Sequence, residues 1–237
     1  MARRTGTAPT RSDRVLGELR ADILNGRLAP GARLGFAGLG ERYGVSTGVL
    51  REVLTRLVEQ GLASTEAQLG FRVIEVSVDE LAQLTAARVA IETMVLRDAV
   101  THGDLGWETD VVAKHHALAR GTAAADAAVA TAAGDSGPGD IAEDWLAAHE
   151  AFHLALLAGC PNHYLVGYAT RLRAIAEVYR CWSRPAQLRT QRDIAGEHRA
   201  IMDAAVGRDA DRAVTLIEEH IRRTSELLIA SQDLSPR

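Results

Sequence analysis

Four of the eight histidines in this chain stand where they could bind one metal ion. His149 and His153 are four residues apart in an apolar segment, so their rings would share one face of a helix. His198 and His220 lie in two later segments whose apolar residues have helical spacing. Imidazoles from three helices could together bind zinc at roughly 2.0–2.1 Å. The alternative is that each histidine is a hydrogen-bonded or surface residue, which is the usual role of a single helical histidine.

Arg88 is a second residue with possible chemistry. It lies within the apolar stripe of a helix predicted from Val78 to Gly103. An arginine on an inward face needs a partner, because an unpaired buried charge is costly. Glu92, one helical turn later, could be this partner, and an anionic ligand could equally be. The sequence leaves both partners open.

The stretch Tyr43–Leu62 predicts a short turn and one helix with two different faces. Ser46 is a suitable N-cap, and Gly61 stands where a left-handed residue commonly ends a helix. One interpretation is an ordinary amphipathic surface helix, which would share these features. The other is a DNA-binding helix, because a narrow face with small, polar and basic side chains could enter the major groove. The apolar stripe consists of Leu50, Leu54, Leu57 and Val58, and the slim face carries Thr47, Gly48, Arg51 and Thr55.

The neighbouring segments favour the DNA-binding interpretation. Helices are predicted at Val15–Asn25 and Phe36–Tyr43, before the helix that follows Ser46. The stretch Leu62–Val76 then changes to β-branched residues around Gly70, which predicts a hairpin. Two helices, a tight turn, a third helix and a hairpin together form a winged helix-turn-helix. We therefore expect this domain at residues 11–76.

The composition agrees with a mainly α protein whose N-terminal part contacts nucleic acid. Only 4% of the 237 residues are aromatic, and alanine and leucine are abundant, which favours helices. The net charge of −4 divides into +3 for residues 1–75 and −7 for the remainder. Residues 1–10 are expected to form a disordered, cationic arm. The chain shows no secretion signal, membrane span or cysteine framework, so we expect a cytoplasmic protein.

Residues 77–232 are expected to form an antiparallel, all-α bundle. The segment Gly121–Asp140 is rich in alanine, glycine and aspartate, and "GDSGPGD" at its end is predicted to be the clearest flexible loop of the chain. After the first predicted helix, further helices are expected at Trp107–Arg120, Ile141–Ala158, His163–Trp182, Arg189–Val206 and Ala210–Gln232.

The front segment resembles the DNA-binding domain of GntR-type bacterial regulators. The resemblance rests on "LRADILNGRLAPGARL", "ERYGVS", "LREVLTRLVEQGLA" and "GFRV". It implies a homodimer that binds a short palindromic operator in double-stranded DNA. The family pattern at the start of this helix is Ser-Arg-Thr-Pro-Val-Arg-Glu. This chain keeps the second arginine of the pattern as Arg51, but Thr47 replaces the first. It also keeps the glycine of the wing, Gly70. This replacement removes a side chain that could read guanine, worth about 1–3 kcal/mol of base discrimination.

The rear segment resembles the FCD effector domain of the FadR subgroup. The motifs are "AHEAFHLALLAGCPNHYL" and "EHRAIMDAAVGRDADRAVTLIEEHI". Many FCD domains bind a metal through Asp-x-x-x-His and two later histidines, and His153, His198 and His220 match this pattern. His149 takes the place of the aspartate, as it also does in regulators of glutarate catabolism that this chain resembles.

Four neutral imidazoles would leave a divalent ion with its full charge of +2. Four nitrogen ligands suit zinc best, with nickel or another transition metal as alternatives. We therefore expect a small carboxylic acid as effector, bound by the metal and by Arg88, and we expect the protein to act as a repressor. The competing hypotheses are a metal-free dimerisation domain and a metallohydrolase, the latter without a His-Glu-x-x-His motif. Further wall residues of the effector site are predicted to be Asn162, Arg173 and Tyr179.

Overall fold

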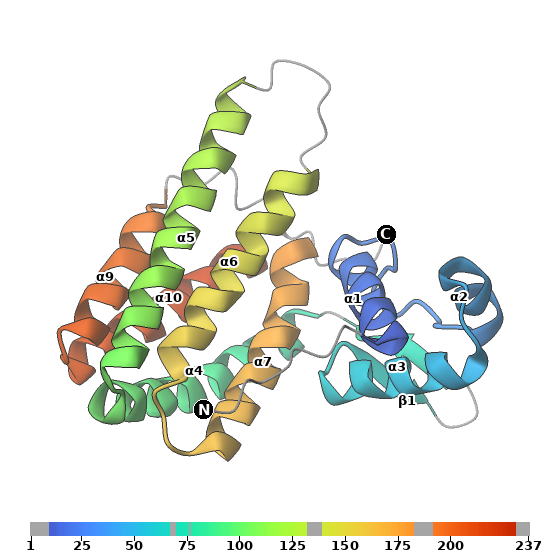
Figure 1. Ribbon diagram of the computed structural model, residues 1–237, viewed down its shortest axis with the longest axis horizontal. Coiled ribbons are helices and arrows are strands. Elements are labelled where there is room, and N and C mark those ends of the chain that lie inside the picture. The colour runs from blue at the N-terminus through green and yellow to red at the C-terminus, as the bar shows by residue number, and fades with distance from the viewer. Residues whose placement is uncertain (1–9, 67–69, 76, 132–138, 183–191, 231–237) are drawn as a thin grey trace, which may run out of the picture. The chain divides into compact units, whose positions relative to one another are not determined.

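The computed structural model is mainly helical, as predicted (Figure 1). It describes residues 10–66, 70–75, 77–131, 139–182 and 192–230. The arm predicted at residues 1–10 lies outside this range, apart from Thr10. Among the described residues, no helix is long and apolar enough to cross a membrane.

The first helix begins earlier than its apolar pattern predicts. Helix α1 spans Arg11–Leu24, whereas the first apolar residue is Val15. Thr10 and Asp13 form a capping box, in which each side chain accepts a hydrogen bond from the backbone N–H of the other residue. This cap satisfies the free amides of the first turn, and so the helix starts before the apolar stripe does.

The helix-turn-helix follows the predicted boundaries closely. Helix α2 spans Phe36–Tyr43 and ends at Gly44, whose φ of 63° is left-handed. Helix α3 spans Thr47–Glu59, and its N-cap Ser46 accepts from the backbone N–H of Val49. Gly61 has a φ of 74° and follows the end of α3, as predicted.

A small antiparallel hairpin forms the wing. Strand β1 spans Ala63–Glu66 and strand β2 spans Gly70–Val73, with Ala63 paired to Val73. Arg33, in the segment between α1 and α2, adds one isolated bridge to β2. Residues 67–69 of the predicted turn lie outside the described residues.

The apolar stripe of α3 lies in the core of this domain. Leu50, Leu54 and Leu57 are fully buried, together with Val53, which the sequence analysis did not include. Val58 is only partly buried, because the stripe follows positions i, i+3, i+4 and i+7 rather than i+8. We call this N-terminal DNA-binding domain the head and its core the head core. Residues of α1 and α2 complete the head core: Val15, Leu16, Leu19, Ile23, Leu39 and Tyr43.

Asp22 connects α1 with α2 through a buried carboxylate. It accepts hydrogen bonds from the Tyr43 hydroxyl and from Arg42 at 2.5 Å, and from Arg27 at 3.1 Å. Burial, and then the hydrogen bond to Asp22, raise the pKa of Tyr43 well above its ordinary value. The tyrosine therefore remains a neutral donor to the Asp22 carboxylate.

Replacement of Asp22 with alanine is expected to lower the free energy of unfolding by about 2–4 kcal/mol. The substitution removes the carboxylate of Asp22, so the buried Tyr43 hydroxyl loses the acceptor of its hydrogen bond. Urea denaturation followed by circular dichroism measures the change. Glu41→Ala, which removes an exposed carboxylate from the same domain, should change stability by less than about 0.5 kcal/mol. Equal effects of the two substitutions would contradict the role given to Asp22.

Helices joined by short connections make up the described residues of the second part of the chain. Helix α5 continues eleven residues beyond its predicted end at Arg120, so that predicted helix end is wrong. The alanine-rich sequence explains the extension, since alanine has the highest helix propensity. Residues 132–138 lie outside the described part. The helices are α4 (Val78–His102), α5 (Leu105–Thr131), α6 (Gly139–Leu157), α7 (His163–Trp182), α9 (Ile194–Val206) and α10 (Ala210–Ala230).

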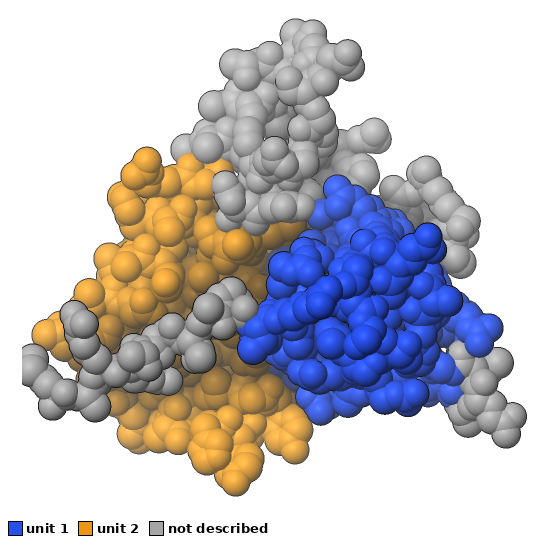
Figure 2. Space-filling model, turned by 45° about the vertical axis from the view of Figure 1, so that its right-hand side comes forward, with its two compact units in different colours: residues 1–84, 171–189, 227–237 blue, residues 85–170, 190–226 orange. Residues whose placement is uncertain are grey.

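The chain divides into two compact units, which Figure 2 shows in different colours. The first comprises residues 1–84, 171–189 and 227–237, and the second comprises residues 85–170 and 190–226. The unit that contains the head thus also includes the second half of α7, where Val178 joins the head core. The second unit has its own core around Phe152, Leu156 and Ile201.

Candidate metal centre and nucleic-acid interface

The structure brings the four predicted histidines together. His149 and His153 come from α6, His198 from α9 and His220 from α10. All four are buried, and one ring nitrogen from each lies within 4.8 Å of the corresponding nitrogens of the others. We call these four residues the histidine cluster. None of these four histidines is therefore a surface residue.

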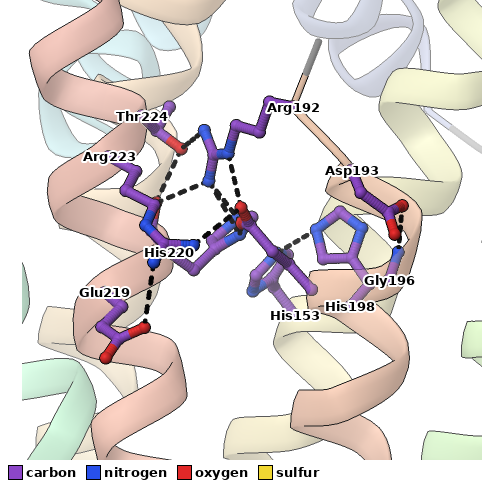
Figure 3. A network of polar contacts seen from close by, with 10 residues as sticks. His153, Arg192, Asp193, Gly196, His198, Glu219, His220, Arg223 and Thr224 are labelled. Carbon is purple, nitrogen blue, oxygen red and sulfur yellow. Dashed lines mark hydrogen bonds and ion pairs between the residues drawn. The ribbon is translucent and has the colours of Figure 1, made fainter.

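The donor set of the histidine cluster fits a transition-metal ion. The Nε2 atoms of His153 and His198 are 3.3 Å apart (Figure 3). Two nitrogen ligands of a tetrahedral zinc ion, each at roughly 2.0–2.1 Å, would be about 3.3 Å from each other. Four neutral nitrogens also match the preference of zinc, nickel and copper rather than that of magnesium or calcium.

Aromatic side chains surround the histidine cluster on α6. Trp145 stacks on His149 with 4.9 Å between ring centroids, and Phe152 packs edge-on against His153 and His198. Phe152 is fully buried. Such packing restricts the imidazole rings and excludes water, and both effects preorganise a binding site.

His220 has a polar network on its other side. Its Nδ1 lies 2.8 Å from the Glu197 carboxylate. Arg192 holds that carboxylate with two hydrogen bonds of 2.7 and 2.5 Å. The Arg192 guanidinium also donates to the backbone carbonyl of His220 and to Thr224, on the next turn of α10 (Figure 3).

The charges in this network are well defined. Burial lowers the pKa of His220 to about 4, and the nearby Arg192 and Arg88 also lower it, against the opposing effect of Glu197. Burial alone would raise the pKa of Glu197, but the hydrogen bonds from His220 and Arg192 outweigh it and hold this pKa below its ordinary value. At neutral pH the imidazole is therefore neutral and the carboxylate is ionised.

Glu197 and Arg192 were not predicted as site residues. The sequence showed only that Glu197 precedes His198, and adjacent helical residues point in different directions. The side chain of Glu197 therefore points away from that of His198, but it can still contact a histidine on a neighbouring helix. No local signal in the sequence connects Glu197 with His220, because the two residues lie on different helices.

Arg88 has the local partner that the sequence allowed. Its Nε lies 2.6 Å from Glu92 Oε1, and the two side chains are 12% and 1% exposed. The positive charge of Arg88 still acts on the ring of His220. Arg88 is therefore paired with Glu92, and its charge contributes to the lowered pKa of His220.

The other predicted effector residues have different positions. The side chain of Asn162 accepts from the backbone N–H groups of Tyr164 and Leu165 and so caps α7. Arg173 and Tyr179 are buried in the first unit, whereas the histidine cluster belongs to the second. Tyr179 packs there with Leu81 and Leu228. Asn162 thus belongs to the same unit as the histidine cluster, whereas Arg173 and Tyr179 do not.

His198 also lines a cavity of about 250 Å³, which the sequence analysis did not identify. Its walls come from α5 and from the start of α9, at residues far apart in the sequence. This volume is slightly below the range of about 300–1,000 Å³ that is typical for drug-sized ligands, and so suits a small molecule. Its polar lining residues are His115, Thr122, Asp193, His198 and Arg199.

The head presents the predicted polar face to solvent. Helix α3 buries its leucines, and every predicted DNA-contacting residue on its other face is exposed. The Arg51 guanidinium lies over the ring of Phe36, 5.3 Å from its centroid. This contact supports the arginine from α2 while leaving it accessible. The exposed residues are Ser46, Thr47, Gly48, Arg51 and Thr55 on α3 and its cap, with Gly70 on the wing.

Comparisons with known proteins identify both parts of the chain. Residues 11–73 match the model of bacterial regulatory proteins of the gntR family, and residues 83–223 match the FCD domain. The chain belongs to the GntR family. As a GntR protein with an FCD domain, it is a DNA-binding transcriptional regulator rather than an enzyme.

Two curated GntR-type relatives cover most of the chain. One is the uncharacterised HTH-type transcriptional regulator BphR of Paraburkholderia xenovorans, 37% identical over 86% of this chain and 79% of the relative. The other is the HTH-type transcriptional repressor GlaR of Escherichia coli, 34% identical over 86% of this chain and 89% of the relative.

Solved structures of GntR regulators share the fold. Escherichia coli McbR/YncC has a TM-score of 0.72 at 21% identity, covering 93% of this chain and 98% of its own. A GntR regulator from Rhodococcus sp. RHA1 has a TM-score of 0.68 at the same identity and coverage. At this identity, these similarities support the architecture alone.

Proposed function

We propose that this GntR regulator is a repressor whose operator affinity is controlled by a small carboxylic acid, bound through a metal ion in the FCD domain. The central observation is the buried histidine cluster, whose four ring nitrogens lie within 4.8 Å of one another. The relative GlaR is a repressor, which supports the direction of regulation.

The DNA-binding part of the proposal rests on the exposed face of α3. Its cap and first turns carry small or polar side chains, so the helix could approach base edges without steric conflict. Arg51 is the exposed arginine on this face. In a homodimer, two such helices would enter successive major grooves about 34–36 Å apart.

The metal part rests on the donors and their surroundings. His149, His153, His198 and His220 would bind the ion, with zinc favoured and nickel or another transition metal as alternatives. When bound, the ion would supply a positive charge that attracts and orients an anion. The chain itself keeps the four rings buried and packs aromatic side chains against His149, His153 and His198, and burial lowers the pKa of His220.

The preference for an acid follows from charge. The four imidazoles contribute no negative charge, and the neighbouring carboxylates Glu92 and Glu197 are already paired with arginines. A divalent ion in the cluster would therefore lack a protein counter-charge among its proposed ligands, and a carboxylate could provide it. The cavity beside His198 offers room for a small acid.

The remaining predicted effector residues have unequal support. Arg88 could share its charge between Glu92 and a bound acid, because it acts on His220 already. Asn162, Arg173 and Tyr179 stay as proposed wall residues, although each has a structural role in the fold.

A binding experiment tests the proposed function. Operator DNA is selected from a random-sequence library with the purified protein, and its affinity is measured by fluorescence anisotropy with Zn²⁺ and a panel of small mono- and dicarboxylic acids. At least one acid should weaken operator binding about 5–150-fold in the presence of metal, which corresponds to a coupling free energy of 1–3 kcal/mol. Operator affinity that no acid changes, with metal or without it, would favour the hypothesis that the FCD domain serves dimerisation only.

A further inference from the structure

The contact between Glu197 and His220 determines where the imidazole carries its proton. An ionised carboxylate only accepts hydrogen bonds, so the 2.8 Å contact requires that Nδ1 of His220 is the donor. In a neutral ring, Nε2 then has the lone pair. This is the tautomer that a metal-binding histidine needs when it binds through Nε2.

Arg192 fixes the carboxylate in the orientation that this contact needs. It binds both oxygens of Glu197 and is itself held by Thr224 and by the backbone carbonyl of His220. The guanidinium is also 3.3 Å from Nδ1 of His220, but both groups are donors there, so that approach is no hydrogen bond. Arg192 thus connects the start of α9 with one turn of α10.

The Glu197 carboxylate is largely enclosed by its contacts with Arg192 and His220. The Arg192 and Glu197 side chains are 10% and 17% exposed. Arg223 adds a longer contact with Glu197 at 3.5 Å, from a side chain that is 55% exposed. The arrangement is therefore a partly buried pair aimed at one histidine, with one peripheral arginine.

We propose that Glu197 and Arg192 are positioning residues that hold His220 in the Nδ1-protonated tautomer, with Nε2 ready to bind the metal. This inference rests on the proposed metal site, but its first consequence concerns the metal-free protein. Neither residue contacts the ion. Glu197 acts through the proton that it accepts, and Arg192 acts through Glu197.

The tautomer can be observed directly by long-range ¹H–¹⁵N NMR of the histidine rings. The His220 signals are assigned by comparison with His220→Gln. In the metal-free wild type, Nδ1 should be protonated and Nε2 unprotonated. In Glu197→Ala the Nε2-protonated form should become populated, whereas Glu197→Gln should keep much of the original form, because its amide oxygen can still accept from Nδ1.

Metal affinity provides the second measurement. Zinc titration against a competing chelator should show that Glu197→Ala binds about 10–100-fold more weakly, the usual effect of losing an outer-shell partner. Glu197→Gln and Arg192→Lys should fall between this variant and the wild type. Glu219→Gln is the matched control, since Glu219 precedes His220 and contacts Arg223 but not the ring. It should leave both tautomer and affinity unchanged.

The outcomes separate this inference from the proposed function. If the wild type binds no metal, the proposed function fails, and the tautomer in Glu197→Ala still decides the positioning role. If Glu197→Ala keeps the Nδ1-protonated form, or binds zinc within threefold of the wild type, the inference is wrong. Should the alanine variant not fold, the same comparison is made with Glu197→Gln and Arg192→Lys, and unchanged zinc affinity in both overturns it.

Discussion

Replacement of His153 with alanine is expected to weaken zinc binding by roughly 100-fold or more, beyond the range of about 10–100-fold for an outer-shell residue. His153 is the central ligand candidate, because it is 3.3 Å from His198 and shares its helix face with His149. Its loss removes one donor and leaves a gap in a buried site.

The thermal consequence follows from mass action. Zinc at 100 times its dissociation constant stabilises the native wild type by about 2.7 kcal/mol, if it binds the unfolded chain negligibly. For a chain of this size, each kcal/mol corresponds to about 2–4 °C, so the wild-type melting temperature should rise by about 5–11 °C. This rise should fall to about 2 °C or less in the variant, because binding weakened 100-fold leaves only about 0.4 kcal/mol of stabilisation at the same zinc concentration, and a chelator should abolish it.

Two further variants make the His153 result specific. His116→Ala removes an exposed histidine from α5, so its zinc-dependent shift should equal that of the wild type. His153→Gln fills more of the space than alanine and guards against simple unfolding of the variant. A zinc-dependent shift of wild-type size in both His153 variants would show that the metal, if it binds, does so elsewhere.

Replacement of Arg51 with alanine is expected to weaken operator binding by about 5–150-fold, the equivalent of one bidentate base contact worth about 1–3 kcal/mol. The protein should keep its fold, because Arg51 is exposed and its contact with the Phe36 ring is worth only about 0.5–1 kcal/mol at such a site. Fluorescence anisotropy with the selected operator and a scrambled duplex measures the effect.

The comparison between the two duplexes distinguishes base recognition from charge. Arg14→Ala removes an exposed arginine from α1 and serves as the matched control for the lost positive charge. Arg51→Lys keeps the charge but not the planar fork that binds a guanine edge. Arg51→Ala should reduce the preference for the operator over the scrambled duplex. If it changes both affinities equally, Arg51 contacts phosphates, and the proposed base contact is wrong.

The head was predictable because its signals are local. The N-cap at Ser46, the glycines at Gly44 and Gly61 and the leucine stripe of α3 act within one or two helical turns. The start of α1 was misplaced because a capping box, rather than the apolar pattern, sets it. The extension of α5 was missed for a related reason: alanine carries little apolar periodicity but strongly favours the helix.

The sequence by itself indicated which residues could bind a metal, since His149 and His153 are at helical spacing and His198 and His220 stand in two later apolar segments. Only the tertiary structure decided that their ring nitrogens meet within 4.8 Å, because three helices from distant segments must pack at the correct angles. It also decided that Glu197 faces His220 rather than its neighbour His198, and that Arg173 belongs to the other unit. Contacts between helices depend on packing that no local spacing encodes.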